Sequence, residues 1–167
     1  MKKAVCVLTN TVDNIEGYIE FNETSNDLVE IVVNVSGLNK GYHGFHIHER
    51  GDLRDGCTST CSHFNPLNTE HGDINDDKYN RHIGDLGNIY ADSDGNVNIT
   101  LYDKLIKLDG EFNIIGRSVV IHADKDDLGI GGLDEQGKIK DMDIHEESLK
   151  TGNAGKRVAC GVIGITK

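Results

Sequence analysis

The chain has 167 residues, of which 37% are hydrophobic and 27% charged, and its formal net charge is -11 at pH 7. This length suffices for one domain with a buried core, and we expect residues 1–167 to form a single domain. The negative charge argues against nucleic acid or an anionic membrane as a partner, because both are polyanions. No apolar run approaches the ~18 residues of a membrane-spanning helix, and the N-terminal apolar stretch is too short for a signal peptide, which favours a cytoplasmic protein.

Short runs rich in Val and Ile recur along the chain, separated by clusters of Gly, Asn and Asp, a pattern typical of strands joined by turns. The predicted strands, in chain order, are Lys3–Thr9, Ile15–Phe21, Val29–Val35, Tyr42–His48, Gly87–Ala91, Asn96–Tyr102, Arg117–His122 and Ala159–Ile165. Asp94-Gly95 is a tight-turn signal between two of them. Because helix signals are scarce, the sequence predicts an all-β fold, an antiparallel sandwich or barrel.

Two long polar segments, Glu49–Gly84 and Ala123–Val158, interrupt the strand pattern. Segments of this length without clear secondary structure are usually functional or disordered. Both begin next to histidines, so we expect functional loops that bound metal and a crosslink hold in place.

The placement of the histidines is the strongest chemical signal. His46 and His48 are two apart on a predicted strand, so their side chains share one face, whereas His43 has the opposite parity and is expected to be structural. His122 ends another strand. The other potential ligands lie in or just after the first long segment and are His63, His71, His82 and Asp85. Histidines on rigid strands suit copper, and histidines with a carboxylate suit zinc, so this set is sufficient for two metals.

The cysteines leave their pairing open at this point. Cys6, Cys57, Cys61 and Cys160 allow three pairings if all are oxidised, and no two of them have C-x-x-C spacing. In a cytoplasmic protein, free thiols or metal ligands are the ordinary expectation.

Seven stretches are specific enough to indicate a family. They are Lys3-Ala4-Val5-Cys6-Val7-Leu8, Gly44-Phe45-His46-Ile47-His48-Glu49, His63-Phe64-Asn65-Pro66-Leu67, His82-Ile83-Gly84-Asp85-Leu86-Gly87-Asn88, Ile114-Ile115-Gly116-Arg117-Ser118, Lys150-Thr151-Gly152-Asn153-Ala154-Gly155 and Ala159-Cys160-Gly161-Val162-Ile163-Gly164-Ile165. In these stretches, and over nearly its whole length, the chain resembles the eukaryotic-type copper/zinc superoxide dismutases. The resemblance implies an eight-stranded antiparallel Greek-key barrel. It also implies an oxidoreductase that converts superoxide to dioxygen and hydrogen peroxide.

The resemblance further implies the site. Copper would be bound by His46, His48, His63 and His122. Zinc would be bound by His63, His71, His82 and Asp85, so that His63 bridges the metals and exchanges a proton during catalysis. Asp126 would link the two sites from behind their ligands, in preference to Asp124, which matches the family motif less well. Arg157 would guide superoxide, beside Thr151 and Lys150 at the channel, and Cys57 would pair with Cys160.

The resemblance also implies a homodimer and raises a copper-delivery chaperone as a candidate partner. Arg50 stands where an aromatic residue is expected at the subunit contact, which weakens the case for the dimer. Cys61 is a departure from the family pattern and could compete for the disulfide. An acidic insertion of roughly a dozen residues around Leu133–Ile144 would oppose an anionic substrate if it covered the channel. Two alternatives on the same scaffold are a copper metallochaperone and a zinc-only binding protein, neither of them catalytic.

Overall fold

Strands are the predominant regular secondary structure of the chain, in a computed structural model that describes residues 1–12 and 14–166. The strands are β1 (Lys3–Val7), β2 (Asn10–Thr11), β3 (Glu16–Glu23), β4 (Val29–Ser36), β5 (Gly41–His48), β6 (Arg54–Cys57), β7 (Asp85–Ala91), β8 (Val97–Asp103), β9 (Ser118–His122) and β10 (Arg157–Ile165). The helices are the short 3-10 helix η1 (Thr58–Thr60) and α1 (Met142–Thr151). Burial alternates along β4, as expected of a strand with one face in the core, whereas β9 is buried throughout.

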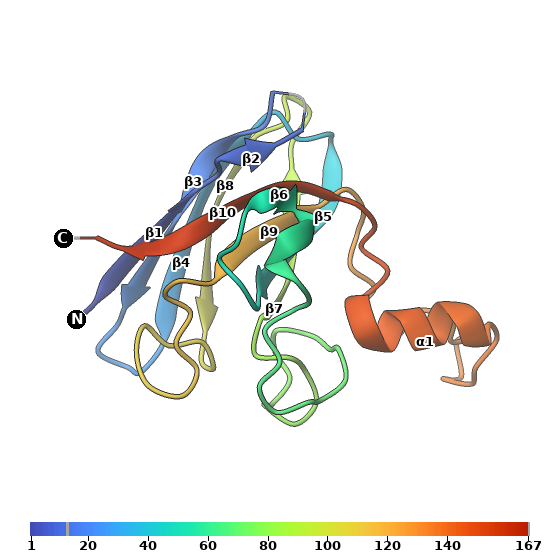
Figure 1. The fold of residues 1–167 in the computed structure, drawn as a ribbon. Coiled ribbons are helices and arrows are strands. Elements are labelled where there is room, and N and C mark those ends of the chain that lie inside the picture. Colours follow the sequence, from blue (N-terminus) through green and yellow to red (C-terminus); the bar gives the residue numbers. More distant parts are fainter. Residues whose placement is uncertain (13, 167) are drawn as a thin grey trace.

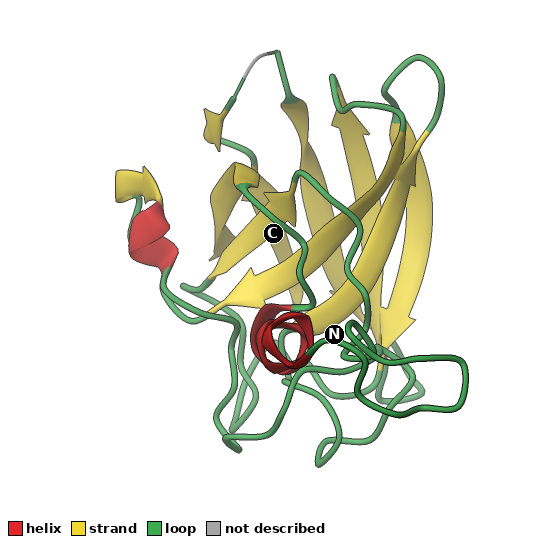
Figure 2. Ribbon diagram, turned by 90° about the vertical axis from the view of Figure 1, so that its right-hand side faces the viewer, coloured by secondary structure: helices red, strands yellow, loops and turns green. Residues whose placement is uncertain are grey.

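The strands form an antiparallel barrel (Figures 1 and 2). Their order is β7-β5-β9-β10-β1-β3-β4-β8, and β2 pairs with β10 outside this path. The first and last strands of the order, β7 and β8, also contact each other, so the sheet nearly closes. The connection from β4 to β5 crosses between distant positions in the sheet, as in a Greek key. The all-β prediction is confirmed, and each of the eight predicted strands lies within two residues of its expected bounds.

The barrel interior is filled by the inward-facing side chains of the strands. Among the fully buried ones are Ile19, Phe21, Ile31, Val33, Phe45, Ile47, Val119 and Ile121. Each such side chain stabilises the fold by about 1.5–3 kcal/mol relative to an exposed position. Because Phe45 and Ile47 point into this core, His46 and His48 must project from the opposite face of β5, outside the barrel.

The Asp94-Gly95 turn joins β7 to β8, as predicted, but these strands are the two ends of the sheet order rather than hydrogen-bonded hairpin partners. The Asp92 carboxylate accepts hydrogen bonds from the backbone N–H groups of Asp94 and Asn96. Gly95 has φ of 80°, a value that favours glycine.

The second long segment differs from its prediction, because it contains the helix α1. The Asp141 side chain caps the first turn by accepting from the Ile144 N–H, and Gly152 ends the helix with φ of 69°. These capping residues are ordinary helix signals. The helix gives little hydrophobic periodicity because Ser148 is the one fully buried side chain among its described residues. In Figure 1, α1 projects from the side of the barrel.

The first long segment contains β6 and η1, followed by turns that lead to β7. Neither short element was predicted, since four and three residues are too few to show a period. No helix in residues 1–12 and 14–166 is both long and apolar enough to cross a membrane.

Candidate metal centre

Four histidines from different parts of the chain meet on the outer face of the barrel. They are His46 and His48 on β5, His122 at the end of β9, and His63 in the first long segment. β5 and β9 are paired neighbours, which brings the strand histidines together. All four are buried, and their ring nitrogens include a set in which every atom lies within 4.8 Å of the others.

Three of these histidines carry a buried nitrogen without a hydrogen-bond partner among the described residues. These nitrogens are His46 Nδ1, His48 Nε2 and His122 Nε2. The opposite nitrogens of two rings donate to carbonyl oxygens, His48 Nδ1 to Cys61 O at 2.8 Å and His122 Nδ1 to Gly155 O at 3.0 Å. A carbonyl oxygen only accepts, so in both rings the proton is on Nδ1. The lone pair of Nε2 is then free to bind a metal. Free imidazole lone pairs that converge in a buried place fit a copper ion.

A second group, which shares His63, lies beside the first. Its members are His63, His71, His82 and Asp85, all buried. Asp85 lies at the centre, with carboxylate oxygens 2.8 Å from His63 Nδ1, 3.0 Å from His71 Nδ1 and 3.1 Å from His82 Nδ1. Three imidazole nitrogens and one carboxylate oxygen form a set that suits zinc. His63 turns Nδ1 toward this group, which leaves Nε2 for the first one.

The Asp126 carboxylate connects the two groups from behind. Its Oδ2 accepts from His46 Nε2 at 2.6 Å and its Oδ1 from His71 Nε2 at 2.8 Å, and the residue is fully buried. Asn88 holds the Asp126 backbone through both its N–H and its C=O. A Cβ on Gly152 would lie 2.1 Å from Asp126 Oδ1, so the end of α1 approaches this link as closely as only glycine allows. Asp124, the alternative to Asp126, is exposed.

Burial and the neighbouring charges set the protonation of these groups. Burial and the nearby histidines hold the pKa values of His46 and His48 well below 6.5, and burial lowers the pKa of His122 to about 4. These rings are therefore neutral at pH 7, which is the form that binds a metal. Burial lowers the pKa of His71 too, but hydrogen bonds to Asp126 and Asp85 outweigh it and raise that pKa to about 10.

Comparison with known proteins identifies the family of the chain. The family model for copper/zinc superoxide dismutase matches residues 15–163. The chain belongs to the copper/zinc superoxide dismutase family. It is 52% identical over 165 residues to a Cu-Zn superoxide dismutase of Paramecium bursaria Chlorella virus 1, covering 98% of this chain and 79% of the viral protein. It is 48% identical over 163 residues to an extracellular Cu-Zn superoxide dismutase of Brugia pahangi, covering 98% and 76%. The crystal structure of the clock protein EA4 matches with a TM-score of 0.86 and 45% identity, covering 99% of this chain and 95% of that one.

In this dismutase-family chain, a cavity of about 530 Å³ opens onto the first histidine group. Its floor includes His48, His63 and His122, and Arg157 lies at its side. The C-terminal half of α1 contributes Glu147, Lys150 and Thr151. The acidic residues of the insertion, Asp134, Glu135, Asp141 and Asp143, are not among the described residues that line it. The insertion instead forms a tight turn that leads into the N-terminus of α1, the end away from the cavity.

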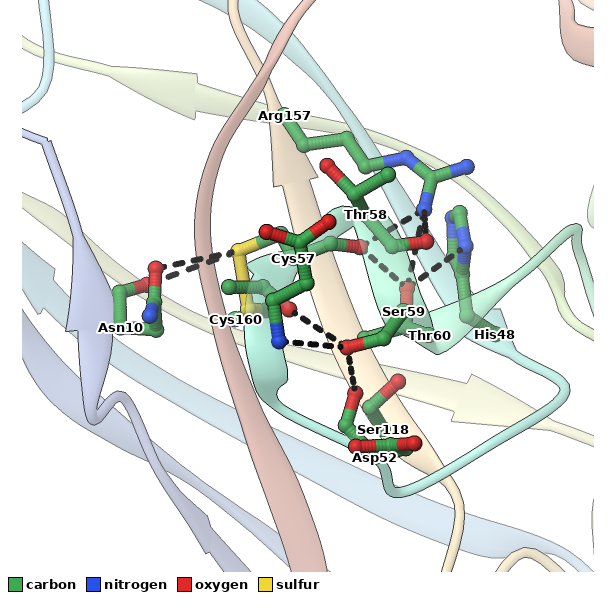
Figure 3. Close-up of a disulfide and its surroundings, with 12 residues drawn as sticks. Asn10, His48, Asp52, Cys57, Thr58, Ser59, Thr60, Ser118, Arg157 and Cys160 are labelled. Atoms are coloured by element: carbon green, nitrogen blue, oxygen red, sulfur yellow. Dashed lines mark hydrogen bonds between the residues drawn. A yellow bond between two sulfur atoms is a disulfide. The ribbon is translucent and has the colours of Figure 1, made fainter.

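The disulfide joins Cys57 in β6 to Cys160 in β10, which is the pairing that the family resemblance implies (Figure 3). Cys6 is a buried free thiol and Cys61 a half-buried one. Next to the disulfide, Arg157 Nη1 donates to Cys57 O at 2.7 Å. The crosslink therefore fixes the loop wall against which Arg157 lies.

Sequence reasoning missed several side chains that shape the site. Asn88 supports Asp126, Glu147 reaches the cavity, and Thr60 contacts Arg157. Glu147 precedes Thr151 by one helical turn and accepts from its hydroxyl at 2.8 Å, so a predicted α1 would have revealed it. No sequence spacing signals Thr60 or Asn88, because their contacts depend on the path of the loops.

Proposed function

We propose that this chain catalyses the disproportionation of superoxide to dioxygen and hydrogen peroxide. Copper would be held by His46, His48, His63 and His122, and zinc by His63, His71, His82 and Asp85. The observation that carries the proposal is the set of converging, unpartnered imidazole nitrogens beneath a cavity that contains Arg157. Bound copper would supply the redox chemistry, because it can exist in two oxidation states that differ by one electron.

Arg157 provides the cation that the anionic substrate needs. Its guanidinium borders the cavity beside His48 and His122, and a guanidinium stays protonated at neutral pH. It therefore attracts superoxide and orients it toward the histidines. Lys150 and Thr151, at the end of α1, would form the approach to this position.

His63 is suited to hold and return a proton. Its Nδ1 lies 2.8 Å from Asp85 Oδ1, while the ring also borders the cavity. Two superoxide ions and two protons give one dioxygen and one hydrogen peroxide, so the second product requires protons at the moment it leaves. His63 would deliver one of them and solvent the other. Zinc would keep His63 in orientation and hold the first long segment in place.

The alternatives without catalysis are less favoured. A zinc-only protein or a metallochaperone would not need a full set of four buried histidines under an open cavity that contains an arginine. A visible absorbance that depends on copper and disappears on chelation would exclude the zinc-only alternative. Rapid turnover of superoxide by the loaded protein would exclude a metallochaperone.

The assembly, the location and the copper supply of the chain are further proposals. We propose one domain that pairs as a homodimer, because Val7 on β1 and Val162 on the adjacent β10 expose apolar side chains, 54% and 39%. Arg50 is exposed, and sedimentation of the wild type and Arg50→Phe would show whether it weakens pairing.

The cytoplasmic location stays a prediction, since one relative is named extracellular, and cell fractionation tests it. A copper-delivery chaperone also stays a prediction, testable by copper loading in cells with and without it.

The test of the function is the decay of superoxide in the presence of protein loaded with both metals and of protein stripped of copper. We expect a second-order rate far above spontaneous dismutation for the loaded protein, and loss of that rate on removing copper. Equal decay rates in the two samples would refute the proposal.

A further inference from the structure

Thr60 is a polar residue that is fully buried between the disulfide and the cavity. It is the last residue of η1, three positions after Cys57, and is 0% exposed. Figure 3 shows its side chain between Arg157 and His48. Burial of a hydroxyl is costly unless it is hydrogen-bonded, so the partners of this hydroxyl indicate its role.

The hydrogen bonds of the Thr60 hydroxyl use its one proton and both lone pairs. Oγ1 donates to Cys57 O at 2.8 Å, which consumes the proton. It then acts as acceptor from Arg157 Nη1 at 3.1 Å. Oγ1 also lies 3.3 Å from His48 Nδ1, so its second lone pair can accept weakly from that N–H, which points mainly to Cys61 O. One oxygen atom therefore contacts both the arginine and a histidine of the copper-type group.

All side-chain hydrogen bonds of Arg157 within the described residues involve one nitrogen. Nη1 contacts Cys57 O at 2.7 Å, Thr60 Oγ1 at 3.1 Å and Thr58 O at 3.3 Å. The guanidinium has further N–H donors on Nε and Nη2. With Nη1 held against the loop, those other donors are the ones available to an anion in the cavity that Arg157 borders.

We propose that Thr60 is a positioning residue for Arg157, and that its hydroxyl sets the distance and angle of the anion-binding edge relative to His48. The carbonyls of Cys57 and Thr58 contact Nη1 from the loop backbone alone. The Thr60 hydroxyl adds a contact that is also tied to the His48 ring. The proposal rests on the proposed dismutase function.

The test compares Thr60→Val, which keeps the side-chain shape and removes the hydroxyl, with Thr60→Ser, which keeps the hydroxyl. Thr100→Val, an exposed threonine on β8, is the control for the substitution itself. We expect the second-order rate of Thr60→Val to fall roughly three- to tenfold, with Thr60→Ser and Thr100→Val near wild type. Copper content and disulfide mapping accompany each variant, and Thr60→Ala replaces Thr60→Val if the latter does not retain both.

Two measurements other than turnover separate positioning from a merely structural role. The affinity for azide, read from the copper absorbance, should fall by a similar factor in Thr60→Val, because azide is a small anion that would use the same edge. In protein that holds only zinc, the NMR signals of the Arg157 guanidinium should show faster rotation in Thr60→Val than in Thr60→Ser.

The decisive comparison is a double-mutant cycle with Arg157→Ala. If Thr60 acts through Arg157, Thr60→Val has no further effect on azide affinity in that background. The inference would be overturned if the two substitutions lowered azide affinity independently, so that their fold-changes multiplied in the double variant. It would also be overturned if Thr60→Val equalled wild type in azide affinity and guanidinium rotation. Loaded wild type that fails to turn over superoxide would instead overturn the proposed function, while the guanidinium measurement still reports on Thr60.

Discussion

Removing the Asp126 carboxylate should weaken zinc binding more than copper binding. The carboxylate orients one histidine of each group, His46 through Oδ2 and His71 through Oδ1. His46 is also held by β5, which pairs with β7 on one side and β9 on the other. His71 lies in the first long segment, outside any strand or helix, so its ring depends more on Asp126.

The expected size follows from the role of such carboxylates. Loss of a group that orients a metal-binding histidine typically costs 10- to 100-fold in affinity, which corresponds to about 1.4–2.8 kcal/mol. For Asp126→Ala we expect zinc affinity near the hundredfold end of that range. Copper affinity should fall by about tenfold or less.

The assay is a titration of each metal, separately, in competition with a chelator whose absorbance reports the free metal. Asp124→Ala is the matched control, because Asp124 is two residues away in the same segment but exposed. We expect the control to bind both metals like wild type. Unchanged zinc affinity in Asp126→Ala, or an equal loss in Asp124→Ala, would refute the reasoning that Asp126 orients His71.

Four further outcomes are expected. His122→Ala should abolish dismutation while zinc binding and the fold persist; substantial activity with copper bound would contradict the site, measured by superoxide decay and metal analysis. Breaking the disulfide with Cys160→Ser frees a loop spanning 103 residues, which in the chain-entropy relation lowers the free energy of unfolding by about 4.7 kcal/mol; urea denaturation checks it, and a change under 1 kcal/mol would be too small for that relation. Burial lowers the pKa of His122 to about 4, below its unfolded value of about 6.5, so the unfolded state takes up the proton first as pH falls. The stability of metal-free wild type relative to metal-free His122→Ala should therefore shrink between pH of about 6.5 and about 4. A difference in urea midpoints that stays constant over this range would argue against it. The second-order rate of superoxide decay should fall with added salt and should fall strongly in Arg157→Glu. The reason is that salt screens the distant charges behind the net charge of -11 over ~8 Å, whereas the Arg157 cation acts on the substrate at close range. A rate that rises with ionic strength would show that the acidic surface dominates.

The strands and the ligand types were predictable because they depend on local pattern. Alternation along β5 places His46 and His48 on one face. It places His43, which has the opposite parity, on the other face, where its ring contacts Asn39 O and His122 O. The pairing of Cys57 with Cys160 came only from family resemblance, since spacing alone permitted three pairings. Local pattern therefore identified the strand face that carries the histidines, while family resemblance supplied the crosslink.

The loops were less predictable because their contacts are set by distant residues. The position of α1 is fixed by Ser148, whose hydroxyl donates to Asp127 at 2.6 Å, and by the close approach of Gly152 to Asp126. Neither contact leaves a periodic trace in the sequence. The same holds for Thr60, whose role depends on where the disulfide places η1.

The two long segments act as one unit because each is tied to a strand and to the other segment. The disulfide ties the first segment to β10, and Asp126 ties the second to His46 on β5. Between them, the His71 N–H donates to Leu149 O of α1 at 2.8 Å, and the His71 ring donates to Asp126. A change at any of these ties is therefore felt in both segments. The strands supply His46, His48 and His122 with fixed directions. The linked loops supply the three histidines of the second group, the wall against which Arg157 lies and the access to the cavity.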